Sequence, residues 1–287
     1  MYALLAYGIW GFAPIYWKQV ERFPAPELVA WRVLASLGVA AILIASLRAW
    51  RDLVDALRSP RRAGSSVCAA LLLAFNWGIF IWAVQNGQIL ATSLGYFINP
   101  LVNVVLGLAI LRERLSRVQS LAVGIAAMGV AVQTALQGEL PWVALALAAS
   151  FGLYGLMRKL GATAPLVGFG METLTLAPLA AGYLVGARVG GVAAASPGMQ
   201  ALVAGSGLVT ALPLLAFASA ARRLPLSLLG MFQYLAPTIT FLLAIGVYGE
   251  PFRFGDAASF ACVWVALALS MWEALVRAPR PGVVESA

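Results

Sequence analysis

The stretch SLGYFINPLVNVVLGLAILRE, residues 93–113, recurs in altered form 137 residues later as GMFQYLAPTITFLLAIGVYGE, residues 230–250. Each copy is an apolar run with a proline near its first third and a glutamate thirteen residues after that proline. Hydrogen-bonding side chains also recur at matched depths, and the two aligned pairs are Tyr96 with Gln233 and Asn103 with Thr240. This pattern predicts a duplicated membrane helix.

The bulk composition favours a protein that lies in a bilayer. Of the 287 residues, 62% are hydrophobic and only 10% are charged, and the mean hydropathy is +0.90. Soluble domains carry about 25% charged residues. A helix needs about 20 apolar residues to cross the hydrocarbon core, so this chain has room for roughly ten spans joined by short loops.

Apolar runs separated by short polar or helix-breaking segments predict an all-α integral membrane protein with ten transmembrane helices. Proline and glycine at the junctions are typical helix ends. The expected spans are 2–17, 27–47, 67–84, 91–111, 118–135, 141–157, 165–186, 201–219, 226–247 and 255–275.

The distribution of basic residues predicts the orientation of these helices. With a cytoplasmic N-terminus, the inner loops and tail hold 14 Lys and Arg residues and the outer loops hold four. An excess of Lys and Arg marks the cytoplasmic side, so both termini are expected inside. The 137-residue offset carries the fourth span onto the ninth, five helices later, and an odd number of spans inverts the second copy. We therefore expect two inverted five-helix repeats, residues 1–137 and 138–287, with sites near the repeat interface.

Several function classes are disfavoured by what the sequence contains. The chain has no histidine, which removes histidine-based catalysis and most zinc sites, and its acids show no clustering of the kind that metals need. An enzyme, a metal site and a cofactor are therefore not expected. The net charge of +8 lies in the loops, as membrane orientation requires, and we expect the lipid bilayer and a small-molecule substrate as partners rather than nucleic acid.

The fourth and ninth spans each carry a polar face. Residues at three- and four-residue steps share one side of a helix, and polar groups in hydrocarbon need partners, so both faces should point into the bundle. They either line a central cavity or join helices through hydrogen bonds. The candidates for substrate binding on these faces are Tyr96, Asn99, Asn103, Gln233, Tyr234 and Thr240.

Aromatic and amide residues elsewhere are candidates to complete such a cavity. Those assigned to substrate binding are Trp10 in the first span, Asn76 and Trp77 in the third, and Tyr154 in the sixth. Tryptophan and tyrosine near span ends are usually interface anchors, whereas these residues lie deeper, and cavity lining and packing remain open. An aromatic, amide-rich cavity suits a flat organic solute better than a metal ion.

Two ionisable residues lie inside apolar spans and are functional candidates for that reason. Arg32 is only about one and a half turns from the outer end of its span, so it can also extend its charge to the interface. Glu172 is the better candidate for a proton-coupling carboxylate, because burial favours its neutral form. The alternative is a structural ion pair with a nearby cation such as Lys159.

The conspicuous prolines and glutamates of the repeat are assigned structural roles. Pro100 and Pro237 are expected to kink or hinge their helices. Glu113 and Glu250 stand where one helix ends and the next begins, so we expect their carboxylates to satisfy free amide groups, with gating as the lesser alternative.

The chain resembles the RarD family of EamA-type permeases in the drug/metabolite transporter superfamily. The resemblance rests on IWGFAPIYWK (9–18), NWGIFIWAVQN (76–86), SLGYFINPLVNVVLG (93–107), YGLMRK (154–159) and FQYLAPTITFLLA (232–244). It covers nearly the whole chain and implies an inner-membrane carrier of small organic molecules, of the kind often described as chloramphenicol-sensitivity permeases.

These observations predict a secondary transporter that exports a small organic metabolite or drug-like solute by alternating access. The sequence holds no P-loop, so a gradient is expected to drive transport. The alternatives are a non-transporting sensor or assembly protein and, with least support, a membrane enzyme that modifies lipids. The oligomeric state is left open by the sequence.

Overall fold

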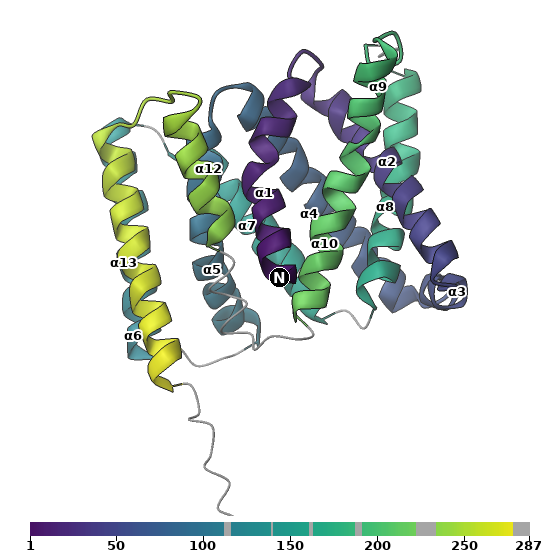
Figure 1. Cartoon of the computed structure of the whole chain (residues 1–287). Helices are drawn as coiled ribbons and strands as arrows, with labels where there is room; N and C mark the ends of the chain where they lie inside the picture. Colours follow the sequence, from purple (N-terminus) through teal and green to yellow (C-terminus); the bar gives the residue numbers. More distant parts are fainter. Residues whose placement is uncertain (112–115, 139, 161–162, 187–190, 222–233, 278–287) are drawn as a thin grey trace, which may run out of the picture. The chain divides into compact units, whose positions relative to one another are not determined.

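A computed structural model describes the chain except for residues 112–115, 139, 161–162, 187–190, 222–233 and 278–287 (Figure 1). All regular secondary structure in the described part is helical. The helices are α1 (Tyr2–Gln19), α2 (Ala25–Ser46), α3 (Trp50–Leu57), α4 (Pro60–Gln85), α5 (Ile89–Leu111), α6 (Arg117–Gln137), α7 (Trp142–Leu160), α8 (Pro165–Gly186), α9 (Pro197–Ala204), α10 (Ser206–Ala221), α12 (Leu235–Gly246) and α13 (Phe254–Arg277).

Nine of the ten expected spans fall on described helices, and the ninth, 226–247, matches α12 only from Leu235 onward because residues 226–233 lie outside the described part. The eighth span corresponds to α10 preceded by the short α9, with Gly205 between the two helices. The expected spans leave the segment between 47 and 67 as a polar connection without a helix, which is wrong in part, because Trp50–Leu57 forms α3. Leu53 and Ala56 of α3 are buried against Val167 and Met171 of α8, and their spacing of three residues is the helical signal that was missed.

Three stretches in the described part are long and apolar enough to cross a membrane: Ala25–Ser46, Pro60–Gln85 and Pro197–Phe217. Shorter apolar helices occur at Ile89–Asn99, Ser120–Leu136, Trp142–Arg158, Leu235–Gly246 and Phe254–Ala266. Many large apolar side chains on the helices are exposed, such as Phe12 on α1, Leu179 on α8 and Leu242 on α12. Such an apolar exterior is typical of helices that face lipid.

Prolines and one glycine account for several helix boundaries. Pro60 is the first residue of α4, Pro165 begins α8 and Pro197 begins α9. Proline is well tolerated there, because the first turn has no use for its missing N–H. Between α4 and α5 the chain turns at Gly87, whose φ of 65° lies in the left-handed region that glycine adopts at little cost.

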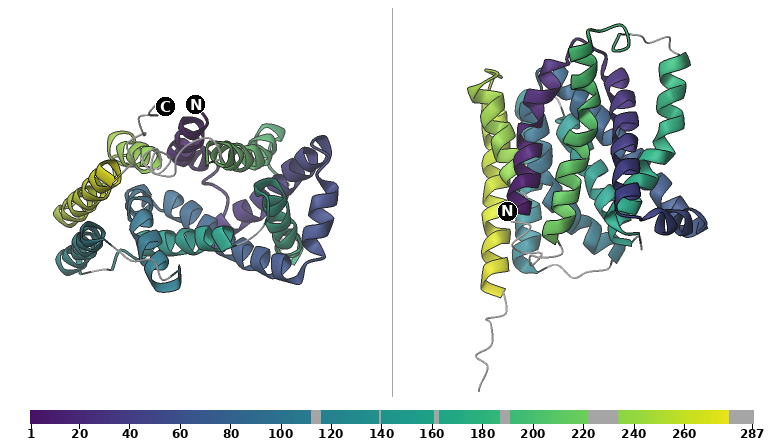
Figure 2. Two further views of the ribbon diagram at one scale, coloured as in Figure 1. Left: turned by 90° about the horizontal axis from the view of Figure 1, so that it is seen from below. Right: turned by 45° about the vertical axis from the view of Figure 1, so that its right-hand side comes forward.

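The chain divides into two compact units. Unit 1 comprises Met1–Leu106 and Trp142–Pro251, and unit 2 comprises Gly107–Pro141 and Phe252–Ala287. In unit 1, α1 packs on α10 and α12, α2 packs on α8 and α10, and α4 packs on α7 and α8 (Figures 1 and 2). In unit 2, α6 packs along α13, where Gly129 lies directly against Cys262.

The two copies of the repeated stretch meet inside unit 1. The hydroxyl of Ser93 on α5 donates a hydrogen bond of 2.7 Å to the carbonyl oxygen of Pro237 on α12. Four residues further along α5, the ring of Phe97 stacks on Tyr234, with ring centroids 6.4 Å apart. Contacts that advance along α5 therefore step backward toward the start of α12, which means that these two segments run antiparallel.

Candidate functional site

A cavity lies within unit 1 among α1, α2, α4, α5, α7, α10 and α12. Its volume is about 90 Å³, counted as the space open to the centre of a water molecule. A single water needs about 10–15 Å³ on this measure, so the cavity has room for several non-hydrogen atoms. Among the predicted site residues, those that line it are Trp10, Asn76, Trp77, Tyr96 and Pro237.

Aromatic rings form much of the cavity wall. Tyr96 lies between Phe80 of α4 and Phe151 of α7, at centroid distances of 6.0 and 6.3 Å. On α1, Trp10 packs on Tyr7 at 5.5 Å. These spacings are typical of favourable aromatic pairs, which hold one another in fixed orientations. The wall therefore offers flat, ordered apolar surfaces.

Asn76 attaches this wall to α7. Its amide nitrogen donates to the carbonyl oxygen of Leu147 at 3.1 Å and to the hydroxyl of Ser150 at 2.9 Å. The side chain is buried, and its carboxamide oxygen accepts no hydrogen bond from the described part of the chain. The oxygen keeps some accessible surface, and Asn76 lines the cavity, so this acceptor is available there.

Arg32 is buried inside unit 1. Only 7% of the residue is exposed, and its guanidinium carbon lies 4.1 Å from the ring centroid of Trp77 and 5.0 Å from that of Trp17. Its Nε donates to the hydroxyl of Thr210 on α10 at 2.8 Å. The sequence alternative, in which this side chain reaches the interface, is therefore wrong.

The position of Arg32 is energetically costly. Removing an ion from water carries an effective penalty of several kcal/mol, and a desolvated cation–π contact returns about 2 kcal/mol. Two tryptophan faces and one hydroxyl thus offset the penalty in part. Neither of the two ion pairs in the described part of the chain includes Arg32. A buried charge of this kind is a functional candidate by default.

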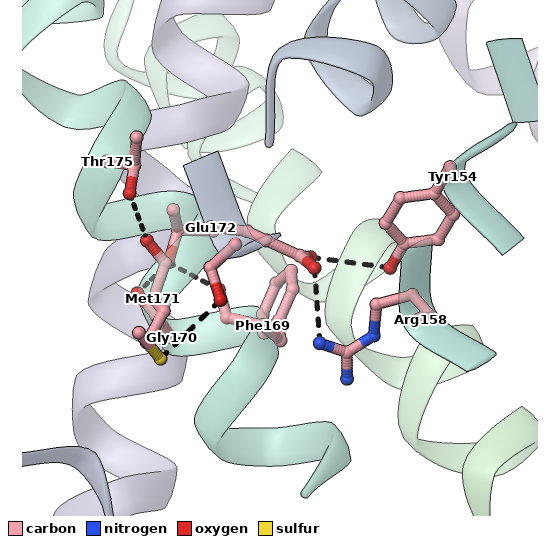
Figure 3. A network of polar contacts seen from close by, with 9 residues as sticks. Tyr154, Arg158, Phe169, Gly170, Met171, Glu172 and Thr175 are labelled. Atoms are coloured by element: carbon pink, nitrogen blue, oxygen red, sulfur yellow. Dashed lines mark hydrogen bonds and ion pairs between the residues drawn. The ribbon is translucent and has the colours of Figure 1, made fainter. Parts of the chain in front are cut away.

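Glu172 forms a second polar cluster, shown in Figure 3. Its carboxylate is 1% exposed, accepts a hydrogen bond from the hydroxyl of Tyr154 at 3.3 Å, and lies 3.3 Å from Nη1 of Arg158. The cation paired with Glu172 is therefore Arg158, whereas the sequence analysis named Lys159 as the example. Arg158 follows Tyr154 by four residues on α7, which places both on one helix face.

This cluster adjoins the cavity wall without lining it. The ring of Tyr154 lies 5.8 Å from that of Phe151, which is a cavity residue, and Tyr154 also packs in one apolar cluster with Trp77. Glu172 is thus one side chain removed from the residues that enclose the cavity. A change in its charge can reach the wall through Tyr154.

Other predicted site residues form hydrogen bonds between helices or lie elsewhere. Asn99 donates to the carbonyl oxygen of Ala148, Thr240 donates to that of Gly11, and neither residue lines the cavity. Tyr234 is the stacking partner of Phe97. Gln233 and Glu113 lie outside the described residues, as do the side chains of Asn103 and Pro100.

Glu250 holds the start of α5. Its two carboxylate oxygens accept hydrogen bonds from the backbone N–H groups of Ile89 at 2.7 Å and Leu90 at 2.8 Å. Both amides belong to the first turn of the helix, whose N–H groups have no partner within the helix. Burial raises the pKa of the Glu250 carboxyl, while the two amides and the nearby Lys18 oppose this shift.

Replacing Glu250 with alanine is expected to lower the free energy of unfolding by about 1–3 kcal/mol, because the amides of Ile89 and Leu90 lose their acceptors. The measurement is thermal unfolding of the protein in detergent. Glu21→Ala is the matched control, since Glu21 pairs with Lys18 at the surface and such exposed pairs contribute at most about 1 kcal/mol. Equal effects of the two changes would contradict the role given to Glu250.

One buried carboxylate was given no role by the sequence analysis. Glu27, at the start of α2, is fully buried, and its Oε1 accepts the N–H of Val192 at 2.8 Å. Gly191 lies close by, since a methyl group there would lie 3.0 Å from the carboxylate. Glu27 therefore anchors the chain ahead of α9. The sequence feature that could have indicated a role for Glu27 is its position at the beginning of an apolar run, five residues before Arg32.

Helices with apolar exteriors around an aromatic cavity define a membrane protein with an internal site, and the comparisons identify its class as transporter. Residues 1–134 match the EamA-like transporter family. The chain is 44% identical to "Uncharacterized transporter YojE" of Bacillus subtilis over 94% of this chain and 92% of that protein. It is also 44% identical to "Protein RarD" of Escherichia coli over 95% and 93%.

The chain belongs to the RarD family of EamA-like transporters. A further relative, "Chloramphenicol-sensitive protein RarD" of Pseudomonas aeruginosa, is 33% identical over 91% of this chain and 89% of its own length. A crystal structure of another protein superposes with a TM-score of 0.64, covering 96% of this chain and 97% of that one. At 18% identity, this last likeness concerns the fold alone.

Proposed function

We propose that the protein is a secondary transporter that exports a small organic metabolite or drug-like solute across the inner membrane by alternating access. The observation that carries this proposal is the cavity beside the antiparallel contact of α5 and α12. A binding site between elements that can rock against each other is what alternating access requires. The cavity is lined by residues of both sequence halves.

The packing of unit 1 supports the expected inverted repeats, residues 1–137 and 138–287. If the first, second and third spans (α1, α2, α4) correspond to the sixth, seventh and eighth (α7, α8, α10), the contact of α1 with α10 is equivalent to that of α4 with α7. In the same way, the contact of α2 with α10 is equivalent to that of α4 with α8. An internal two-fold relation between the halves produces such matched pairs.

The chemistry of the cavity indicates the class of solute. Aromatic faces dominate the wall, and Asn76 and Arg32 supply polar groups. Sites for organic ligands combine apolar walls with a few placed polar groups in this way. We infer a flat organic solute that fills a volume of several non-hydrogen atoms.

The membrane orientation and the driving force follow from charge. The 14 Lys and Arg residues assigned to one side favour cytoplasmic termini, and the apolar exterior favours a multi-pass location in the inner membrane. We assign proton coupling to Glu172, because its carboxylate is buried next to the cavity wall. Tyr154 and Arg158 hold the carboxylate in place when it is ionised.

Transport is tested with purified protein in liposomes, using a solute found by comparing metabolites of cells with and without the protein. Flux is expected to fall by about tenfold or more in a Tyr96→Ala/Gln233→Ala double variant, because Tyr96 is a wall residue of the cavity and Gln233 is its predicted counterpart in the repeat. Phe12→Ala is the control, since Phe12 on α1 is 52% exposed and lies outside the cavity.

The results separate the possibilities. Normal flux in the double variant would refute the proposed site. Saturable binding of the solute without flux in any vesicle would favour the sensor and contradict the transporter.

A further inference from the structure

The guanidinium of Arg32 has bonding capacity that the protein does not use. An arginine has five N–H donors, and here one of them, on Nε, is bonded to Thr210. The hydroxyl hydrogen of Thr210 goes to the carbonyl oxygen of Ser206 at 2.8 Å, which leaves a lone pair of Thr210 directed at Arg32. In the described part of the chain, Arg32 makes no other hydrogen bond or ion pair.

The unused donors have access to the cavity. Arg32 lines the cavity, and both of its terminal nitrogens keep some accessible surface. The guanidinium carbon lies over the rings of Trp17 and Trp77, at 5.0 and 4.1 Å from their centroids, and these cation–π contacts use no N–H donor. What remains available is the edge that carries the terminal N–H groups.

The positive charge also lacks a counterion among the described carboxylates. Glu27, on the same helix, accepts the N–H of Val192, and Glu172 pairs with Arg158. Glu250 is bonded to the start of α5. A desolvated cation that faces a cavity without a protein anion is arranged to receive an anion from outside.

We propose that Arg32 binds the carboxylate of the solute, so that the cavity takes flat organic monocarboxylic acids. This inference rests on the proposed transport site and names the substrate class for it. The edge of a guanidinium matches a carboxylate through two parallel hydrogen bonds. The apolar body of the acid then packs on the rings of Tyr96, Phe80 and Phe151.

The surroundings favour a carboxylate over a phosphate. Arg32 is the single Lys or Arg among the residues assigned to the described cavity, and the rest of its lining is mainly apolar. A phosphate carries up to two charges and three acceptor oxygens, and so needs more donors than one guanidinium edge. One planar cation with aromatic neighbours is better matched to a monoanion.

The test uses full-length protein in detergent and two probes of the same shape, 4-nitrobenzoate and the neutral 4-nitrobenzamide. Binding is measured as saturable quenching of tryptophan fluorescence, because Trp17 and Trp77 flank Arg32. Wild type is expected to bind the carboxylate about tenfold more tightly than the amide, as a charge-assisted contact implies. Inorganic phosphate is expected to compete weakly.

Variants assign this preference to the residue. In Arg32→Gln the two probes should bind within about twofold of each other, and in Arg32→Lys the preference should be reduced but present, because the charge remains without the planar fork. Arg22→Gln is the control, since it removes the same charge from an exposed position. Arg22→Gln should retain the tenfold preference.

The result that would overturn the inference is equal binding of the two probes by wild type, or binding of neither. This comparison needs no variant, so it holds even where Arg32→Gln fails to fold. An unchanged preference in a folded Arg32→Gln would also overturn it. Transport of neutral solutes with no preference for carboxylates would refute this inference while leaving the proposed function, whereas a carboxylate preference without flux would do the reverse.

Discussion

Gly207→Ala is expected to be among the most disruptive single-methyl changes in unit 1. A methyl group on Gly207 of α10 would lie 2.5 Å from the carbonyl oxygen of Ala35 and 2.6 Å from its carbonyl carbon. Both atoms are backbone atoms of α2, so no side chain can rotate away and the helices must separate. Overpacking of this kind costs about 1–3 kcal/mol and sometimes more. The measurement is thermal unfolding in detergent.

The same change should also affect the site. Gly207 precedes Thr210 by three residues, so separation of α10 from α2 moves the hydroxyl of Thr210 away from Arg32. Gly38→Ala on α2 is the matched control, because a methyl group there would meet nothing within 4 Å. The control should unfold at or above the wild-type temperature, since alanine favours helix over glycine. Equal melting temperatures of the two variants would contradict the close helix contact.

The positions of the helices could be read from the sequence because two local signals coincide. Long apolar runs mark the segments, and proline or glycine marks their ends, as at Pro60, Pro165 and Gly87. Such signals depend on neighbouring residues alone. The helix α3 was missed because its eight residues are too short for a span and are interrupted by Arg51, Asp52 and Asp55.

The repeat also predicted the relative direction of its two copies. Sequence similarity between residues 93–113 and 230–250 indicated a related pair of opposite orientation, and the contacts of Ser93 with Pro237 and of Phe97 with Tyr234 are those of an antiparallel pair. The number of membrane spans and the equivalence of the two halves stay predictions.

The surroundings of Arg32 could not be predicted, because they are created by tertiary packing. Trp17, Trp77 and Thr210 come from α1, α4 and α10, and nothing in the sequence ties their depths to that of Arg32. Distance from the end of the span was the only measure available, and it favoured an interfacial position. In the structure, the neighbouring helices bury Arg32 instead.

The choice between Arg158 and Lys159 as the partner of Glu172 depends on helical phase and on one structural contact. Tyr154 and Arg158 are four residues apart and share a helix face, whereas Lys159 is rotated by about 100° from Arg158 on a helix of 3.6 residues per turn. A buried carboxylate that meets Tyr154 is therefore placed to meet Arg158. Helical phase alone selects between the two cations once the contact with Tyr154 is known.

Arg158→Met is expected to destabilise the protein more than Glu172→Gln. Loss of the cation leaves a carboxylate that is 1% exposed with only Tyr154 to support it, and breaking a buried pair in this way costs about 3–5 kcal/mol. The lower end of that range applies, because the Arg158 side chain is 23% exposed and water can reach it. Glu172→Gln leaves Arg158, which can turn toward solvent, and should cost less.

The double variant Arg158→Met/Glu172→Gln separates pairing from other effects. Replacing both charges removes the unpaired carboxylate, so the double variant should unfold at a higher temperature than Arg158→Met alone. Additive losses would show that the two residues act independently and would contradict the ion pair. Gly168→Ala offers a second route, since its methyl group would collide with the guanidinium of Arg158 and displace it.

The same variants decide whether the pair has a role beyond stability. A carboxylate that couples transport must take up and release a proton during the cycle, so flux through Glu172→Gln should lose its dependence on pH while the protein remains folded. Arg158→Met should instead keep a dependence on pH, because the carboxyl of Glu172 is still present. A folded Glu172→Gln variant with the full pH dependence of wild type would limit Glu172 to a structural ion pair, since an amide cannot carry the proton.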